Sequence, residues 1–397
     1  MREFWSSVVK FFVSLQLTVV LLILSMLLVF VATLDQVNLG IWAVQEKYFR
    51  SFIVLWDVNG VPIPVFPGGY FVGGLLLLNL VASHIYRFHF TWKKAGILLT
   101  HFGLIVLLVG ELLTGLWQED YQMRLDEGET KNYSESPRFN ELAITDVTDP
   151  QWDDVVAIPE ARLAGGDVIQ HAKLPFRVVP KIYFPNSAMA MQGQQAAGMP
   201  GSAAPQLATQ GIGTQIAVTP LRTTYKQDER NLPAAYVELI GTEGSLGTWL
   251  VSPMLMAPQT FSYQGRSFRL AMRFEREYKP FALTLLDFSH DKYPGTEIPK
   301  NFSSRVRLAS ADGRDDREVL IYMNNPLRYA GLTFYQAGFD NNDRTTVLQV
   351  VRNPSWLLPY IACGLMTLGL LLQFGIHLSG FFRKRRTVAA RTTAVTA

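Results

Sequence analysis

Four segments of this chain are long and apolar enough to cross a lipid bilayer, and they limit the possible folds more than any other feature. They cover about residues 11–34, 65–86, 95–117 and 356–382. A helix of about 20 apolar residues crosses the hydrocarbon core, so the sequence predicts four transmembrane helices. The first segment follows Arg2 and Lys10 as a secretory signal would. It is too long for one and has no small-residue cleavage site after it, so we expect it to remain in the protein.

Basic residues next to the four segments predict their orientation. Lys and Arg are retained on the cytoplasmic side in short loops, and they flank the amino terminus, the loop at 87–94 and the tail after residue 382. We therefore expect both termini in the cytoplasm and residues 118–354 on the outer face. This outer segment is slightly acidic, and the rest of the chain is basic. The basic residues thus lie where membrane flanks and anionic lipid headgroups require them, which excludes a nucleic-acid-binding function.

The segment at 118–354 reads as a β-rich domain. Short runs of β-branched and aromatic residues, such as REVLIYM at 317–323 and LTFYQAGF at 332–339, alternate with turn signals such as ADGRDD at 311–316. Long helical periodicity is absent, which favours a mainly antiparallel β-sandwich or barrel-like architecture. Residues 187–213 lack charge and are rich in Ala, Gly, Gln and Pro, which predicts a flexible insertion.

The predicted fold is therefore an α+β membrane protein with three parts. A membrane domain at 1–117 holds the first three helices, an extracytoplasmic β-rich domain covers 118–354, and residues 355–397 form the fourth helix and a basic cytoplasmic tail. Aromatic residues and apolar runs at 35–64 predict a re-entrant or interfacial helix at headgroup level. In the second helix, small residues such as Gly73 would allow another helix to pack closely.

The third apolar segment carries His101 and Glu111, and an ionisable residue inside a transmembrane helix is a candidate functional residue. At about 1.5 Å per residue, His101 and His377 both lie roughly 10 Å inside the cytoplasmic boundary, with His84 nearer the surface. Neutral imidazole is a common metal ligand and binds haem iron axially, so two histidines at one depth could hold a haem. A hydrogen bond to a neighbouring helix is the alternative role. Glu111 is too far along the helix to share the site. A proton relay and a protonated hydrogen-bond partner are its two candidate roles, and we favour the second.

The sequence contains no motif of a known catalytic or nucleotide-binding site. The G-x-S-x-G, Walker, G-x-G-x-x-G and C-x-x-C-H patterns are all absent. Ser289, His290 and Asp291 are adjacent on a predicted strand, where successive side chains point to opposite faces, so they cannot form a catalytic triad. The single cysteine, Cys363, excludes an internal disulfide, and we expect it to pack inside the helical bundle.

Several long strings resemble the ResB family, also called CcsB, of cytochrome c biogenesis proteins. They are HFGLIVLLVGELLTG at 101–115, YQMRLDEGETKNY at 121–133, LTLLDFSHDKYPGTEIPKNFSSRVRL at 283–308, IYMNNPLRYAGLTFYQAGFD at 321–340 and VVRNPSWLLPYIACGL at 350–365. The resemblance covers nearly the whole chain except residues 187–213. It implies a four-span subunit of the bacterial plasma (inner) membrane with a large outer domain.

The resemblance also implies partners and a cofactor. Members of the family work with a ResC or CcsA membrane subunit in the System II pathway, which moves haem outward and presents it to apocytochrome c. The tryptophan-rich haem segment belongs to that partner, and the eight tryptophans here are scattered. This chain is therefore expected to be a non-catalytic or accessory subunit of the synthase. By this resemblance His101 would hold haem b transiently near the cytoplasmic face, with His84 and His377 as further candidates and a second ligand on the partner.

Two other functions are compatible with the sequence. The first is a structural scaffold whose outer domain organises partner subunits without binding a cofactor. The second is a b-type electron-transfer subunit, for which His101 and His377 would be the two haem ligands within one chain.

Overall fold

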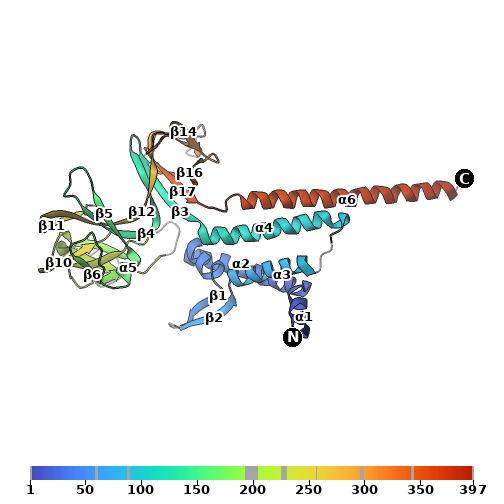
Figure 1. The fold of residues 1–397 in the computed structure, drawn as a ribbon, viewed down its shortest axis with the longest axis horizontal. Coiled ribbons are helices and arrows are strands. Elements are labelled where there is room, and N and C mark those ends of the chain that lie inside the picture. The colour runs from blue at the N-terminus through green and yellow to red at the C-terminus, as the bar shows by residue number, and fades with distance from the viewer. Residues whose placement is uncertain are drawn as a thin grey trace. The chain divides into compact units, whose positions relative to one another are not determined.

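A computed structural model describes residues 2–58, 61–86, 90–192, 204–224, 230–255, 257–295, 299–340 and 344–395. The chain divides into two compact units (Figure 1). Met1–Glu119 and Asn353–Ala397 form a helical unit, and Asp120–Arg352 form a β unit. Four helices are long and apolar enough to cross a membrane, and the β unit is a large, mainly antiparallel structure. The predicted class, an α+β membrane protein, is confirmed.

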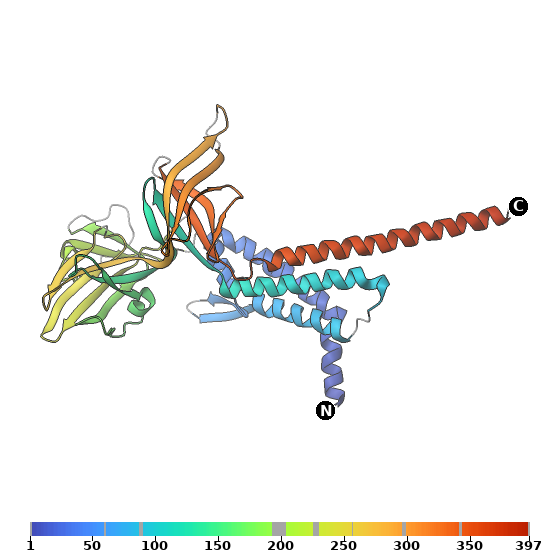
Figure 2. The same ribbon diagram turned by 45° about the horizontal axis from the view of Figure 1, so that its top comes forward.

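Within the described residues, the helical unit holds five α-helices (Figure 2). They are α1 (Arg2–Phe12), α2 (Leu15–Val44), α3 (Gly69–Tyr86), α4 (Ala95–Trp117) and α6 (Leu358–Val395). All but α1 belong to the four candidate spans. The first span begins later than predicted because Ser14 caps α2, its hydroxyl accepting a hydrogen bond from the Gln16 N–H at 3.1 Å. The last helix continues well beyond residue 382, where the predicted span ends.

The segment between the first two spans contains a short helix in its first part only: residues 41–49 are helical beyond a kink at Gly40, and the Tyr48 hydroxyl donates back to Asp35 at 2.8 Å. The segment is made of the end of α2, the π-turn η1 (Gln45–Phe49), and strands β1 (Ile53–Val58) and β2 (Val61–Pro67). The two strands pair as an antiparallel hairpin. β-Branched residues favour extended backbone, and the prolines of VPIPVFP cannot lie inside a helix. The second span therefore begins at Gly69 rather than near residue 65.

Glycines on α4 let it lie close beside α6, with the two helices antiparallel (Figures 1 and 2). The glycines in this contact recur every seven residues and are Gly96, Gly103 and Gly110. A Cβ atom added at Gly103 would lie 2.7 Å from the Met366 Cγ, which real Cβ atoms do not tolerate. A Cβ atom on Gly73 would meet nothing within 4 Å, so the close packing predicted for the second span is wrong there. The close contact lies instead on α4.

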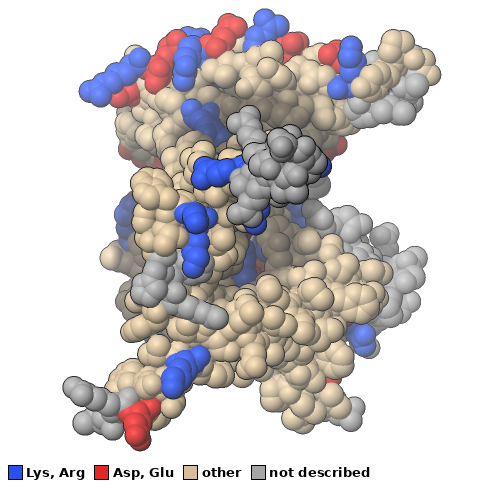
Figure 3. All heavy atoms as spheres, turned by 90° about the vertical axis from the view of Figure 1, so that its right-hand side faces the viewer, with Lys and Arg blue, Asp and Glu red and all other residues tan. Residues whose placement is uncertain are grey.

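The surface of the helical unit is largely apolar. Figure 3 looks toward the C-terminal end of α6, and most of the helical surface in this view is uncharged, with isolated basic residues. Large apolar side chains on α2, α3, α4 and α6 are exposed, as expected for helices that lipid surrounds. Cys363 is also exposed, although the sequence predicted that it packs inside the bundle. The reason is that α6 packs mainly against α4, which leaves its other sides open.

The β unit contains one short helix, η3 and most of the strands. Its described elements are β3 (Glu119–Asp126), β4 (Thr130–Asp146), β5 (Asp154–Pro159), α5 (Glu160–Ala164), β6 (Arg177–Phe184), β7 (Ser187–Met191), η3 (Ile212–Gln215), β8 (Ile216–Pro220), β9 (Ala234–Gly241), β10 (Gly244–Val251), β11 (Gln259–Tyr263), β12 (Arg266–Lys292), β13 (Pro299–Ser310), β14 (Asp316–Tyr322), β15 (Leu327–Tyr329), β16 (Leu332–Asp340) and β17 (Thr345–Arg352).

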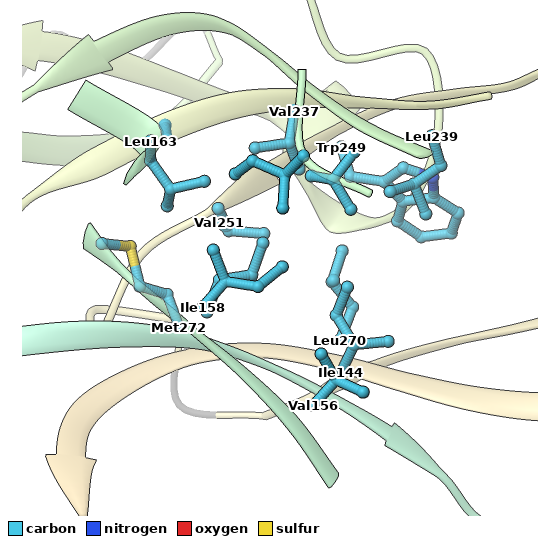
Figure 4. Close-up of a cluster of buried hydrophobic side chains, with 14 of the residues drawn as sticks. Ile144, Val156, Ile158, Leu163, Val237, Leu239, Trp249, Val251, Leu270 and Met272 are labelled. Carbon is cyan, nitrogen blue, oxygen red and sulfur yellow. The ribbon is translucent and has the colours of Figure 1, made fainter. Parts of the chain in front are cut away.

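Two sheets pack face to face in one half of the β unit. One sheet contains β11, β12, β4 and β5, and the other contains β10, β9 and β6. Figure 4 shows the apolar side chains between them, including Ile144 and Leu270 from the first sheet and Val237 from the second. Alternate residues of β9 face opposite ways, so that Val237 joins this core and Tyr236 joins a separate core that includes β8. This half has the sandwich arrangement that the sequence predicted.

The long strands β4 and β12 continue into the second half of the β unit. There they form one sheet with β3 and β13–β17. β14 lies next to β15 and β16, so the sheet curls back around a core that includes Leu283, Phe334 and Val350. This half is barrel-like.

Part of the predicted flexible insertion at 187–213 belongs to the packed fold. Ser187–Met191 forms β7, which pairs with β8, and Ala208 is buried beside Leu250. Met189 and Leu207 also pack against this cluster, so a composition rich in Ala, Gly and Gln did not mean the absence of packing. Residues 193–203 of the predicted insertion lie outside the described residues.

Candidate functional site

Two of the three candidate histidines lie in contact inside the helical unit. His84 is near the end of α3, and His101 is in the second turn of α4. Their ring centroids are 5.1 Å apart, and the ring planes meet at 76°, an edge-to-face contact. Both side chains are half-buried. Because the short connection between α3 and α4 makes the two helices antiparallel neighbours, it brings the end of one helix opposite the start of the next.

A hydrogen bond fixes which nitrogen of His84 carries its proton. The Nδ1 atom lies 2.8 Å from the carbonyl oxygen of Leu80, one turn earlier on α3. A carbonyl oxygen can only accept, so Nδ1 is the donor, and in the neutral ring Nε2 would carry the lone pair. Metal-binding histidines are commonly oriented by such a bond from the second ring nitrogen. His84 thus has the tautomer and support of a metal ligand.

His377 lies in a different place. It is exposed on α6, and the side-chain amide of Gln373 donates to its ring at 2.9 Å. The α4 residue level with Gln373 is Gly96, at the very start of α4. His377 is one turn farther along α6 and so lies beyond the end of α4, whereas His101 is more than a turn inside it. The equal depth that the sequence predicted for His101 and His377 is therefore wrong.

Glu111 and His89 are two further ionisable residues at or near the predicted spans. Glu111 is exposed on α4, and no described residue of this chain hydrogen-bonds or ion-pairs with it. The hydrogen-bonding role predicted for Glu111 is therefore not fulfilled within the described part of the chain. His89 lies outside the described residues.

The contact between His84 and His101 limits how the pair could bind a haem. Two imidazoles that bind one iron from opposite faces hold their ring centres about 6 Å apart, given metal–nitrogen bonds of about 2 Å. The observed 5.1 Å and edge-to-face geometry leave no room for a porphyrin between the rings. The pair fits a site in which one ring binds the iron and the other packs beside it. The opposite face of the haem would then be open to a ligand from another chain.

The β unit offers no comparable arrangement. Ser289, His290 and Asp291 lie on β12 and pair with successive residues of β13, so their side chains alternate between faces and the triad is excluded as predicted. The His290 ring packs against both Phe302 and Phe339, with centroid distances of 4.6 Å and 4.7 Å. In the part of the chain that the structure describes, no three His, Cys, Asp or Glu residues gather as a metal site would require.

The signal for the His84–His101 contact was present in the sequence. Both histidines lie within two turns of the connection between the second and third apolar segments, and consecutive spans with a short loop pack as an antiparallel pair. Matching depths from the charged boundaries instead favoured His377, because that estimate treated each helix as ending at its nearest basic residue. The real end of a span depends on its packing.

Comparisons with known proteins reach the β unit. A sequence model of the ResB-like family matches residues 244–347, which run from β10 into β17 and include none of His84, His101 and His377. A stretch of 92 residues is 35% identical to Protein NrfI of Wolinella succinogenes. This stretch is 23% of the present chain and 10% of NrfI, so the chain matches only a small part of that protein's length. The family model thus matches about a quarter of the chain, residues 244–347, and the similarity to NrfI supports the same ResB-like family.

Proposed function

We propose that this protein is a haem-handling membrane subunit of a bacterial System II machinery for cytochrome c maturation. Similarity to the ResB-like family supports a role in cytochrome c biogenesis. The observation that carries the haem assignment is the contact between His84 and His101, which lie on helices apolar enough to span a membrane. Ionisable side chains within a membrane span cost free energy, so two of them in contact mark a candidate functional site.

The position of the pair supports uptake of haem from the cytoplasmic leaflet. Both histidines lie near the connection between α3 and α4, which contains Lys93 and Lys94. Basic loops of this kind remain in the cytoplasm. The protein would then have both termini in the cytoplasm of a bacterial plasma (inner) membrane and its β unit on the outer face.

Each histidine has a separate part in this proposal. His101 binds the iron of haem b, and His84, held by its bond to Leu80, packs against the His101 ring and is available as an alternative ligand. A membrane subunit of the ResC or CcsA type supplies the second axial ligand. Because this chain offers only one side of the iron, haem is held transiently and can pass to the partner and then to apocytochrome c. The chain itself is an accessory subunit without catalytic groups.

The proposal is tested by purifying the chain together with its partner subunit and recording haem absorbance in the Soret region per mole of protein. We expect His101→Ala to lose most of the haem and His84→Ala to lose part of it. His377→Ala should retain its haem, because His377 lies away from the pair. His171→Ala is the matched control, since His171 is exposed in the β unit.

A further measurement separates ligation from simple support of the fold. Imidazole added to the His101→Ala complex should restore the Soret band, because a free imidazole can occupy the space of the missing ring and bind the iron. Unchanged haem content in both His101→Ala and His84→Ala would refute the assignment. A wild-type complex without haem would favour the scaffold function, and a stable, reversible redox signal from the isolated chain would favour the electron-transfer function.

A further inference from the structure

The β1–β2 hairpin carries apolar side chains that no described part of the helical unit covers. The members of this exposed set are Ile53, Leu55, Trp56, Val58, Val61, Ile63 and Val65, with exposed fractions between 42% and 59%. They occupy both faces of the hairpin: Trp56 is paired with Ile63 on one face, and Leu55 is paired with Pro64 on the other. A contiguous apolar patch on an exposed surface marks an interaction site. The hairpin is thus built for surroundings other than water.

Two prolines remove hydrogen-bond donors from the free edge of β2. Pro62 and Pro64 alternate along β2, opposite Asp57 and Leu55. A proline can lie in an antiparallel pair only where its nitrogen faces away from the neighbouring strand, so both prolines face the outer edge. This edge cannot accept another strand in the usual way, because two of its N–H groups are missing. Extension of the hairpin by a strand of another protein is therefore disfavoured on this side.

The base of the hairpin is fixed to the outer ends of two spans. The Gly68 N–H donates to the Phe52 carbonyl at 2.9 Å. Gly68 must be a glycine, since a Cβ atom there would lie 2.1 Å from the Ser51 carbonyl oxygen. Val54 is fully buried in a cluster with Leu28 of α2. The base of the hairpin is thus held against α2 and beside the start of α3.

Only one layer of a membrane meets both requirements of this hairpin. Its apolar faces need a non-aqueous environment, but a two-stranded sheet has open edges, and such edges do not occur in the hydrocarbon core. The headgroup layer provides acyl chains for the faces together with water and polar groups for the remaining edge N–H and C=O groups. Trp and Tyr are enriched at the headgroup level of membranes. Here the Trp56 ring lies 5.9 Å from the Lys47 ammonium, and the Tyr70 ring lies 5.9 Å from the ring of Phe52.

We propose that the β1–β2 hairpin is a lipid-binding element that lies in the headgroup layer beside α2 and α3. Its apolar surface continues the surface that these two spans present to lipid, with Phe52 and Phe71 exposed where the hairpin joins α3. The ligand is the headgroup and upper acyl region of the bilayer. The proposal is independent of the haem-handling function, because it concerns residues that lie in the opposite half of α3 from His84.

The test uses labels at single cysteines in the full chain, reconstituted in lipid nanodiscs. Cys363→Ser removes the only native thiol. Leu55→Cys and Ile63→Cys then place an environment-sensitive fluorophore on opposite faces of the hairpin. Two control sites calibrate the signal: Arg314→Cys in an exposed turn of the β unit, where the side chain is 87% exposed, and Leu371→Cys on the exposed surface of α6. Lipids with a nitroxide at the headgroup or deep in the acyl chain, and iodide in the water, serve as quenchers.

We expect both hairpin labels to lose most of their fluorescence to headgroup nitroxides and little to iodide, whereas the Arg314 label shows the reverse pattern. The Leu371 label should respond mainly to the deep nitroxide. The proposal is overturned if either hairpin label behaves like the Arg314 label, or if the deep nitroxide quenches the hairpin labels more than the headgroup nitroxide. It is also overturned if adding the partner subunit abolishes the lipid quenching, because a protein would then be the occupant.

Discussion

Glu160 illustrates how burial changes the chemistry of one side chain in the β unit. It begins α5, where the Asn140 side chain donates to its Oε2 at 2.9 Å and the Tyr183 hydroxyl donates to the same oxygen at 3.4 Å. Burial raises the pKa of Glu160 above its ordinary value of 4.5, although both hydrogen bonds favour the carboxylate. Burial and the nearby Glu160 also raise the pKa of Tyr183. Ionisation of Glu160 in the folded β unit therefore lowers its stability.

Replacing Glu160 by glutamine should remove this cost while keeping an oxygen that accepts both hydrogen bonds. The folded pKa lies above the unfolded one, so the cost is fully present above the folded pKa and disappears as the pH falls below 4.5. We expect Glu160→Gln to have a higher Tm than the wild type at neutral pH, and the difference to shrink as the pH is lowered. Thermal unfolding followed by circular dichroism measures this. Glu243→Gln, at an exposed turn, is the control, and a Glu160→Gln difference that does not vary with pH would contradict the explanation.

The close packing of α4 against α6 depends on the glycines of α4. Neither helix gains from the hydrophobic effect by leaving lipid, so their association relies on close van der Waals packing. At Gly96, Gly103 and Gly110 a Cβ atom would approach α6 to between 2.5 Å and 2.9 Å. Thr114 on α4 and Ser355 just before α6 add a hydrogen bond of 2.9 Å near the other end of the pair. The fourth span is therefore held by shape rather than by apolar area.

A larger residue in this contact should separate the helices. Gly103→Leu would force overlap with Met366, and we expect it to destabilise the helical unit by about 1–3 kcal/mol. Unfolding of the purified protein in mixed micelles measures the change. Gly74→Leu makes the same substitution on α3, where a Cβ meets nothing within 4 Å, and should have little effect. Equal destabilisation by both variants would show that the α4–α6 contact is not specific.

The whole molecule consists of two units that each contain their own buried residues. The β unit, Asp120–Arg352, has separate apolar cores in its sandwich half, its barrel-like half and around β8. Long strands β4 and β12 run through both halves, with bulges between Phe274 and Arg276 where the ladder changes register. Because β4 and β12 contribute to the sheets of both halves, unfolding of one half would disrupt the other. We therefore expect the β unit to unfold in one step.

A fragment of residues 120–352 should fold without the helical unit. We expect it to be soluble without detergent, to have the circular dichroism of a β-sheet protein, and to unfold in one cooperative transition. Gel filtration and thermal denaturation check these properties. A fragment in which Leu283, in the core of the barrel-like half, is replaced by Asp should lose the transition. Aggregation of the wild-type fragment, or two separate transitions, would show that its halves do not form a single cooperative unit.

The sequence was sufficient for features that depend on local pattern and length. Apolar runs predicted the four spans, and alternation in strings such as LTFYQAGF predicted strands like β16. Prediction from the sequence failed where the structure of a segment depended on the other segments of the chain that pack against it. The residues at 35–64 were predicted to form a re-entrant or interfacial helix. Residues 41–49 are helical beyond the kink at Gly40, but residues 53–67 form a hairpin, because their prolines and β-branched residues favour paired strands. Cys363 was predicted to be buried, and which side of α6 meets α4 decided otherwise.

By itself, the sequence determined that the protein is an α+β membrane protein with candidate histidines near the basic ends of its spans, because bilayer thickness and charge act on composition and spacing alone. Only the tertiary structure decided which histidines meet. The antiparallel packing of α3 and α4 brings His84 to 5.1 Å from His101, and the glycine contact of α4 with α6 leaves His377 beyond the end of α4. Neither fact is encoded in any one helix, since the rotation and vertical offset of a helix are set by the neighbours against which it packs.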